Sequence, residues 1–343
     1  MTRRVYVAYT GGTVGMHQTE RGYEPLPGYL SGLLSSQAPF HGPGMPEITV
    51  QQYDPLLDSS NMVPADWAVI ARDIADRAAD YDGFLVLHGT DTMAYTASAL
   101  SFMLEGLDRP VILTGSQIPL SQPRSDAYAN LITALMLIER YGPRLPEVCV
   151  YFGGRLLRGN RTKKIDAEEF AAFDSPNLPP LGRVGIDFDM DWDLIRPAES
   201  GPLRVRPIGE ASVAAFRLFP GLEARYLASL FGAGIDGLVL ECYGAGNAPH
   251  RNTEFMRVLR EATDAGVVIV DVPQPIYGCA NLSLYATGRA LLDVGVVGGL
   301  DMTPEATLAK LSYLFARGHA PAEVRDLVQQ DLRGELTAPD PLD

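Results

Sequence analysis

The sequence predicts an α/β protein whose mostly parallel sheet is covered by helices on both faces. Along most of the 343 residues, short apolar runs rich in β-branched residues alternate with segments whose apolar residues recur at helical spacing. The runs are continuously apolar, which is typical of parallel strands buried on both faces. A polar stretch rich in proline interrupts this alternation before it resumes, so we expect two domains.

The first domain is expected to be an α/β catalytic domain spanning residues 1–185. Its apolar runs predict strands at 4–9, 47–53, 83–89, 110–115 and 147–154. A helix is predicted over 64–82, because apolar residues recur there at helical spacing and Pro64 suits a first helical turn. A second helix is predicted over 93–107.

The polar, proline-containing stretch predicts a linker with an extended piece at 186–210. The α/β alternation then continues in a second, smaller domain at 211–336, with apolar segments at 213–221, 223–232, 237–244 and 267–273. The last residues, 337–343, are expected to be a loose tail. We find no internal repeat and no low-complexity tract.

The composition argues against several classes of protein. The net charge of −14 argues against nucleic-acid binding, which usually requires a basic face. No apolar run approaches the roughly 20 residues that span a bilayer, and the first residues lack the features of a signal peptide. Cys149, Cys242 and Cys279 form no CxxC pair, so we expect reduced structural thiols in a cytoplasmic protein.

The first predicted strand ends in "YTGGTVGM" (9–16), which has two interpretations. The glycines Gly11, Gly12 and Gly15 do not fit the dinucleotide fingerprint, and no lysine completes a Walker loop. Other anion-binding loops use paired glycines, so a structural or phosphate-binding loop is one interpretation. In the other, Thr13 is a nucleophile at the carboxyl end of a strand, where open α/β sheets bind ligands.

A threonine nucleophile needs a base, and the five histidines form no metal or hydrolase motif. His88 ends a predicted strand and is interpreted as a packed or loop-orienting residue rather than a catalytic one. Gly89, Thr90 and Asp91 follow it and form a second strand–Gly–Thr turn, so the two threonine loops could converge. Alternatively, Thr90 or Asp91 is simply the N-cap of the next helix.

Lysine is scarce in this chain and occurs only at 163, 164 and 310, whereas the other basic residues are arginines. The segment "RGNRTKK" therefore suggests a position that requires an amine, because a desolvated lysine can lose its proton and arginine cannot. A solvated basic turn is the alternative. With Thr90 and Asp91, such a lysine would form a relay of base and orienting residue.

Together these motifs resemble those of the L-asparaginase family, specifically its cytoplasmic type I branch. The matching segments run in the family's order along nearly the whole chain: "YTGGTVGM", "DSSNM", "LHGTDTMAYTASALSF", "TGSQIP", "RGNRTKK", "YGAGNAP" and "LRGEL". The two threonine motifs together are highly specific. The resemblance implies the two-domain asparaginase/glutaminase-like fold and hydrolysis of L-asparagine to L-aspartate and ammonia, without a metal or cofactor.

The resemblance also implies the catalytic residues. Thr13 matches the family nucleophile, which forms a β-aspartyl ester that water cleaves. Thr90 matches the threonine that is relayed to a lysine, and Asp91 offers a carboxylate to the substrate α-ammonium. Lys164, rather than Lys163, aligns with the family lysine. Backbone N–H groups near the two threonines are expected to form the oxyanion hole.

Further positions are implied to bind or cover the substrate. Tyr23 matches the tyrosine of the mobile loop after the nucleophile, with Tyr29 as its rival. Asp58, Ser59 and Ser60 match the turn that receives the substrate's α-amino and α-carboxylate groups, although "DSSN" also fits an ordinary turn.

Two weaker segments concern the pocket and the assembly. Ser116, with Gln117 beside it, follows a strand and is expected to line the pocket. Asn247 matches an asparagine that in relatives reaches a neighbouring protomer's site, which implies a homodimer or homotetramer. The small-molecule substrate is L-asparagine, and no nucleic-acid or membrane partner is expected.

Some positions depart from the type I pattern for a second, allosteric asparagine site. Pro275 stands where the pattern has cysteine, and Cys279 comes four residues later. Glu241 and Cys242 replace an arginine and a serine, and Lys163 replaces a threonine. We therefore expect allosteric activation by asparagine to be absent or rewired.

Other functions remain as alternatives. Within the family, these are a glutaminase-leaning enzyme or an amidotransferase subunit, although the first motif begins near residue 10 and leaves no room for the subunit's extra N-terminal domain. A non-catalytic module binding an amino acid or phosphate is the third. The segment "DFDMDWD" (187–193) fits a strand better than a calcium loop, since Trp192 and Ala198 replace the required glycine and glutamate.

Overall fold

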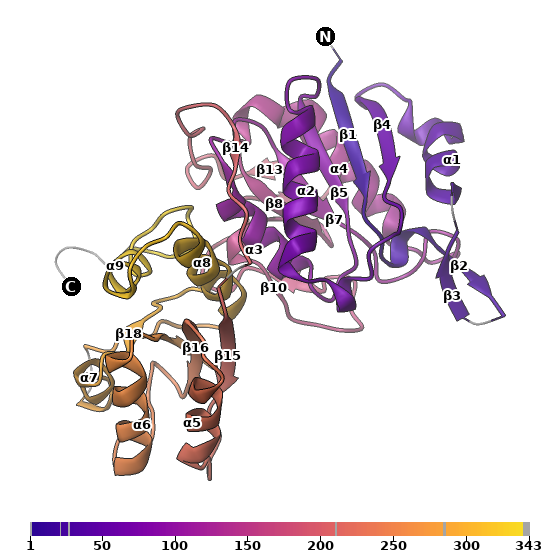
Figure 1. Ribbon diagram of the computed structural model, residues 1–343. Helices are drawn as coiled ribbons and strands as arrows, with labels where there is room; N and C mark the ends of the chain where they lie inside the picture. The colour runs from indigo at the N-terminus through magenta and orange to yellow at the C-terminus, as the bar shows by residue number, and fades with distance from the viewer. Residues whose placement is uncertain (1, 21, 27, 210, 284–285, 339–343) are drawn as a thin grey trace. The chain divides into compact units, whose positions relative to one another are not determined.

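The computed structural model describes residues 2–20, 22–26, 28–209, 211–283 and 286–338 (Figure 1). The chain forms two compact units, Met1–Arg206 and Pro207–Asp343. Their division falls inside the range 186–210 that the sequence predicts as a linker. Each unit has its own sheet and its own apolar core.

The first unit is built on a mixed sheet with a parallel centre. Its strands are β1 (Arg4–Tyr9), β4 (Glu47–Gln52), β5 (Gly83–Leu87), β7 (Val111–Thr114), β8 (Val148–Phe152), β9 (Arg155–Arg158), β12 (Gly182–Val184) and β13 (Phe188–Met190). They lie in the order β13-β12-β9-β8-β7-β5-β1-β4, and β4, β1, β5, β7 and β8 run parallel. All five runs predicted as strands in this unit form strands.

Helices cover both faces of this sheet, as predicted. They are α1 (Tyr29–Ser36), α2 (Pro64–Arg77), α3 (Met93–Met103) and α4 (Ala127–Tyr141). Val5 and Val7 of β1 belong to the same apolar cluster as Leu131 of α4. Tyr6 points to the opposite face and donates a hydrogen bond to Asp73 of α2 over 2.9 Å. Figure 1 accordingly shows α2 in front of the sheet and α4 behind it.

The range predicted as a linker is largely part of the first unit. β13 pairs with β12, and β14 (Arg204–Val205) pairs with β6 (Leu104–Glu105), which also ends α3 earlier than predicted. Phe188 and Met190 pack against the apolar cluster, and the Arg144 guanidinium lies 3.5 Å from the Trp192 ring centroid. Burial of these apolar and aromatic side chains explains why this polar segment is held against the sheet.

The second unit has a fully parallel sheet. Its strands are β15 (Val213–Arg217), β16 (Gly237–Cys242), β17 (Val268–Pro273) and β18 (Val297–Gly298), in that order. Its helices are α5 (Ala224–Gly232), α6 (Thr253–Asp264), α7 (Ala286–Asp293), α8 (Pro304–Ala316) and α9 (Pro321–Leu327). Leu238, Leu240, Phe255 and Ile269 contribute to its core.

The tail, the cysteines and the helices can also be compared with the sequence predictions. Thr337, at the start of the predicted loose tail, is anchored because its N–H and Oγ1 both donate to Asp301, over 2.8 and 2.6 Å. Residues 339–343 lie outside the described part. The thiols of Cys149, Cys242 and Cys279 are all unpaired. None of the helices within the described ranges has the length and apolar character needed to cross a membrane.

Candidate active site

The two threonine loops meet at one edge of the first sheet. Because β1 and β5 are parallel neighbours, the segments that follow them emerge on the same side. Gly12 has a φ of 91°, and a Cβ there would lie 2.5 Å from the Gly89 nitrogen and 2.7 Å from its Cα. The backbones that carry Thr13 and Thr90 are therefore in direct contact, which only glycine permits at this position.

The "DSSN" turn forms a third wall beside these loops. A Cβ on Gly89 would lie 2.3 Å from the Ser59 Oγ, and Ser59 is buried. Asp58 caps the short 3-10 helix Ser59–Asn61 by accepting from the Ser60 N–H over 3.0 Å. The Thr92 hydroxyl donates to the Ser59 carbonyl over 2.8 Å, which ties this turn to the start of α3. The turn is thus fixed with Ser60 exposed.

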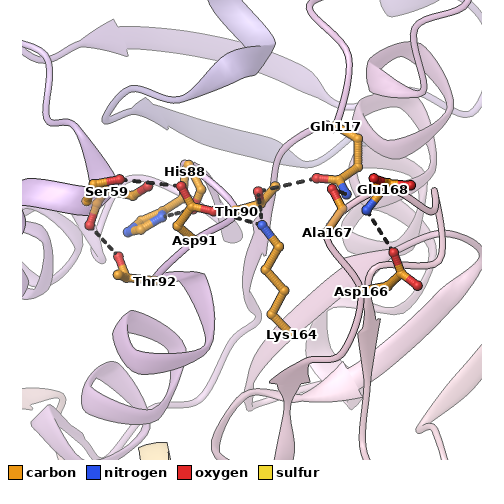
Figure 2. Close-up of polar contacts among 12 residues, drawn as sticks. Ser59, His88, Thr90, Asp91, Thr92, Gln117, Lys164, Asp166, Ala167 and Glu168 are labelled. Carbon is orange, nitrogen blue, oxygen red and sulfur yellow. Dashed lines mark hydrogen bonds and ion pairs between the residues drawn. The ribbon is translucent and has the colours of Figure 1, made fainter.

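A lysine, a threonine and an aspartate form the polar centre of this edge. The Lys164 Nζ donates to the Thr90 Oγ1 over 2.9 Å and to the Asp91 Oδ1 over 2.8 Å (Figure 2). Thr90 is only 8% exposed, whereas the Asp91 side chain is 63% exposed. The hydrogen bond from Lys164 lowers the pKa of Asp91, with a smaller contribution from the Ser60 hydroxyl. Asp91 is therefore an anion that is open to solvent on one side.

Short strands bring Lys164 into this centre. β10 (Lys163–Lys164) pairs with β11 (Phe173–Asp174), with Lys164 opposite Phe173. The preceding 3-10 helix Gly159–Arg161 is buried and contacts α3. The structure thus brings Lys164 to Thr90, as the resemblance implies. The third lysine of the chain, Lys310, belongs to a different environment in the second unit, where its Nζ lies 2.5 Å from the Glu335 Oε1 in a buried ion pair.

Gln117, rather than Ser116, contacts Thr90. The Thr90 hydroxyl lies 3.4 Å from the Gln117 Oε1, whereas the Ser116 Oγ is fully buried and has no hydrogen-bond partner in the described ranges. Asp126 fixes this loop by accepting from the Gln117 N–H over 3.0 Å and from the Ile118 N–H over 3.0 Å. The sequence motif "TGSQIP" pointed to this loop, but nothing in it decides which of the two adjacent polar side chains faces Thr90.

His88 is a structural residue, which was the favoured interpretation. Its Nδ1 lies 2.7 Å from the Gly89 carbonyl, and because a carbonyl can only accept, Nδ1 carries the proton. Its Nε2 then accepts from the Thr96 hydroxyl over 2.8 Å. Burial lowers the pKa of His88 to about 4, so the ring is neutral at physiological pH.

The two candidate tyrosines lie in different environments. Tyr23 is on β3 (Gly22–Pro25), which pairs with β2 (Met16–Thr19), and it is 46% exposed. β3 contacts the short 3-10 helix Thr13–Gly15, so its hairpin lies beside the Thr13 loop. Tyr29 instead begins α1 and packs edge-on against His17, with ring centroids 5.7 Å apart. Of the two, Tyr23 is on the element that contacts the proposed nucleophile's helix.

Most of the remaining sequence candidates are in the second unit. Asn247 pairs with Tyr243 in a bridge and accepts a hydrogen bond from the Thr287 hydroxyl. Glu241 lies 3.3 Å from Arg217, and its carbonyl accepts from the Gln274 side chain over 2.9 Å. Cys242 is buried and Pro275 is exposed, whereas Lys163 belongs to the first unit. Within the part of the chain described, no group of three or more potential ligands could hold a metal ion.

Comparison with known proteins agrees with this architecture. The family model for the asparaginase N-terminal domain matches residues 4–196, and that for the glutaminase/asparaginase C-terminal domain matches residues 212–328. The chain is 48% identical over 338 residues to L-asparaginase 1 of Escherichia coli (strain K12), which covers 98% of this chain and 99% of that protein.

Solved structures agree as well. L-asparaginase I from Vibrio cholerae O1 biovar eltor str. N16961 matches with a TM-score of 0.91 and 45% identity, over 98% of this chain and 100% of that one. The thermostable L-asparaginase from Thermococcus kodakarensis matches with a TM-score of 0.88 and 33% identity, again over 98% and 100% of the two chains. The family and fold implied by the sequence motifs are therefore confirmed: this chain belongs to the asparaginase family.

Proposed function

We propose that this protein is an L-asparaginase that hydrolyses L-asparagine to L-aspartate and ammonia. The observation that carries the proposal is the hydrogen-bonded set of Lys164, Thr90 and Asp91 beside the glycine contact that brings the Thr13 loop to the Thr90 loop. A binding protein needs no such pairing of a hydroxyl with an amine, whereas a hydrolase needs a hydroxyl, a base and an orienting residue.

In the first half of the reaction, Thr13 is the nucleophile. Its hydroxyl oxygen attacks the side-chain amide carbon of asparagine, and the carbon–nitrogen bond breaks. The hydroxyl proton is transferred to the departing amide nitrogen, which leaves as ammonia. A β-aspartyl ester of Thr13 remains. Backbone N–H groups of the two threonine loops stabilise the negative charge that develops on the amide oxygen.

In the second half, water cleaves the ester. Thr90 and Lys164 form the relay that removes a proton from water, and that proton returns to the Thr13 oxygen as L-aspartate leaves. For this step Lys164 must be a neutral amine, since an ammonium cannot accept a proton.

The remaining residues hold or cover the substrate. The exposed Asp91 carboxylate receives the substrate α-ammonium, and Asp58, Ser59 and Ser60 bind its α-amino and α-carboxylate groups. The loop that carries Ser116 lines the pocket beside Thr90 through the side chain of Gln117. Tyr23 belongs to the hairpin that covers the site after substrate enters, which excludes water during the first half of the reaction.

The proposal also covers the protein's localisation, assembly and substrate preference. We propose that the protein acts in the cytoplasm, as a homodimer or homotetramer, with Asn247 reaching the site of a neighbouring protomer. A small-molecule amide is the substrate, and a narrow pocket that excludes one methylene is worth roughly 1–3 kcal/mol of preference for asparagine over glutamine.

Ammonia release tests the proposed function directly. Rates should be measured with L-asparagine and L-glutamine for the wild type, Thr13→Ala, Thr90→Val and the control Thr49→Val, an exposed threonine of β4. We expect turnover of asparagine in the wild type and control, and a loss of roughly 10³-fold or more in both site variants. A folded wild type that binds asparagine without releasing ammonia would favour an amino-acid-binding module instead.

A further inference from the structure

A buried tyrosine packs against the turn that carries Thr13. Tyr9 is the last residue of β1, and its carbonyl accepts from the Tyr53 N–H over 3.0 Å. Its side chain is fully buried in the apolar cluster of the first unit, together with Val5 and Val7 of the same strand. The sheet therefore fixes the backbone of Tyr9, and the core fixes its ring.

The Tyr9 hydroxyl has a close neighbour but no hydrogen-bond partner. A Cβ on Gly15 would lie 2.1 Å from the Tyr9 Oη and 2.5 Å from its Cζ, so the hydroxyl end of the ring contacts the Gly15 backbone. Among the residues that the structure describes, none forms a hydrogen bond with this oxygen. Burial raises the pKa of Tyr9 to about 12, so the hydroxyl keeps its proton at physiological pH and can donate it.

This hydroxyl does not stabilise the described state. A polar group buried without a partner is unfavourable, and phenylalanine would fill the same space in the cluster without that cost. Tyr6, on the opposite face of the same strand, has the usual arrangement, because its hydroxyl donates to Asp73 over 2.9 Å. A buried polar atom without a partner requires an explanation, and its place beside the nucleophile's turn points to a use in another state of the enzyme.

Gly15 is the junction between the nucleophile's turn and the hairpin that carries Tyr23. The short 3-10 helix Thr13–Gly15 ends there, and β2 begins at the next residue. The hairpin of β2 and β3 projects from the first unit (Figure 1). Within the turn, the Val14 carbonyl accepts from the Leu120 N–H over 3.2 Å. Closure of the hairpin therefore moves Gly15 while the neighbouring residue stays attached to another loop.

We propose that Tyr9 is a positioning residue for the nucleophile, and that its O–H donates to the Gly15 carbonyl oxygen when the hairpin closes over the substrate. The inference rests on the proposed function. Gly15 has no side chain, so this carbonyl is the only acceptor that it can offer to the hydroxyl packed against it. The hydrogen bond fixes the end of the turn two residues after Thr13, and so holds the attacking hydroxyl in place.

Tyr9 acts through the turn and does not touch the substrate. In the proposed function, other loops hold the α-amino and α-carboxylate groups of asparagine, and these loops are unchanged when the Tyr9 oxygen is removed. The hydrogen bond to Gly15 is needed when Thr13 attacks. Its loss should therefore lower kcat and change KM much less.

Tyr9→Phe is the decisive variant because it removes only the oxygen. Since this oxygen has no partner in the described state, we expect the urea midpoint of the free variant to equal or exceed that of wild type. We expect kcat for asparagine to fall about 3- to 10-fold, which is the effect of one lost hydrogen bond, with KM within about two-fold of wild type.

Tyr6→Phe is the matched control on the same strand. It removes a hydroxyl that is already hydrogen-bonded to Asp73, so it should lower the urea midpoint and leave kcat and KM unchanged. Gly15→Ala tests the contact from the other side, because its Cβ would displace the Tyr9 hydroxyl, and kcat should fall at least as far as in Tyr9→Phe. Its control is Gly32→Ala in α1, where a Cβ would meet no atom within 4 Å.

The experiment measures ammonia release over a range of asparagine concentrations and urea unfolding of the free enzyme, for wild type and the four variants. Wild-type kcat in folded Tyr9→Phe would overturn the inference. A Tyr9→Phe midpoint clearly below wild type would also overturn it, because the hydroxyl would then have a structural partner in the free enzyme. An equal loss of kcat in Tyr6→Phe would do the same, since a general change in the core would explain both. These results leave the asparaginase proposal intact, whereas an inactive wild type would overturn both.

Discussion

The carboxyl group of Asp271 should make the stability of this protein depend on pH. Asp271 lies on β17 in the core of the second unit and is fully buried. The Cys242 thiol is its hydrogen-bonding neighbour, and this contact lowers the pKa of Asp271 by less than burial raises it. The Gly246 backbone packs against this carboxyl group, because a Cβ on that glycine would lie 2.9 Å from the Asp271 Oδ2. Burial raises the pKa of Asp271 from 3.8 to about 7.

The sign of the effect follows from proton binding. Between these two pKa values, folded Asp271 keeps its proton while the unfolded chain has lost it, so the folded state loses stability as pH rises. The stabilisation is complete below the unfolded pKa and is gone once pH passes the folded value of about 7. At about 1.4 kcal/mol for each pKa unit, the loss between pH 5 and pH 8 is roughly 2–3 kcal/mol.

Urea unfolding of wild type and Asp271→Asn at pH 5 and pH 8 measures this contribution. The amide cannot ionise, so the variant should gain roughly 2–3 kcal/mol relative to wild type between the two pH values. Asp264→Asn, at an exposed position in α6 of the same unit, is the matched control and should show no such change. Protein concentration must be held constant, because assembly also changes apparent stability. A stability difference between Asp271→Asn and wild type that is equal at both pH values would refute the reasoning.

Three further predictions concern packing, the site and regulation. Arg158→Met should lower the free energy of unfolding by about 3–5 kcal/mol in urea titrations, because it leaves Glu147 buried without the guanidinium that now lies 2.6 Å away; a loss under 1 kcal/mol would contradict this. Gly12→Ala should cost about 2 kcal/mol or more and most of the activity, since its Cβ would meet Gly89. Gly42→Ala should be neutral in both assays, because its Cβ would come no nearer than 4.0 Å to another atom, the Ala38 carbonyl oxygen. Initial rates against asparagine concentration should follow a hyperbola, because the positions of the type I allosteric pattern are changed; a sigmoidal curve would show that the regulation is retained.

Much of the fold was predictable because its strands are continuously apolar and its first helices are strongly periodic. The run 83–89 is an example: every residue of β5 is buried, so no other local structure competes with a central strand. The range 186–210 was not predictable in the same way. Its sequence is polar and contains proline. Contacts with residues far along the chain, namely the β14–β6 pairing and the packing of Phe188 and Met190 on the apolar cluster, make it part of the first unit.

In the candidate site, too, contacts between residues close in the sequence were predictable, whereas contacts between distant residues were not. Thr90 and Asp91 are adjacent, and their loop follows directly from a strand end, so their proximity is a local property. Lys164 is 74 residues from Thr90, and its contact depends on the short β10–β11 pair. Whether Ser116 or Gln117 faces Thr90 depends on how Asp126 holds the loop backbone, which no spacing in "TGSQIP" specifies.

The paired glycines before Thr13 allow close packing within the protein itself. In the structure, Gly12 approaches the backbone of Gly89, and Gly89 approaches the side chain of Ser59. The absence of side chains therefore brings three walls of the site together. It follows that the Thr13 and Thr90 loops are one packed structure, so a Cβ at Gly12 displaces the relay threonine as well as the nucleophile.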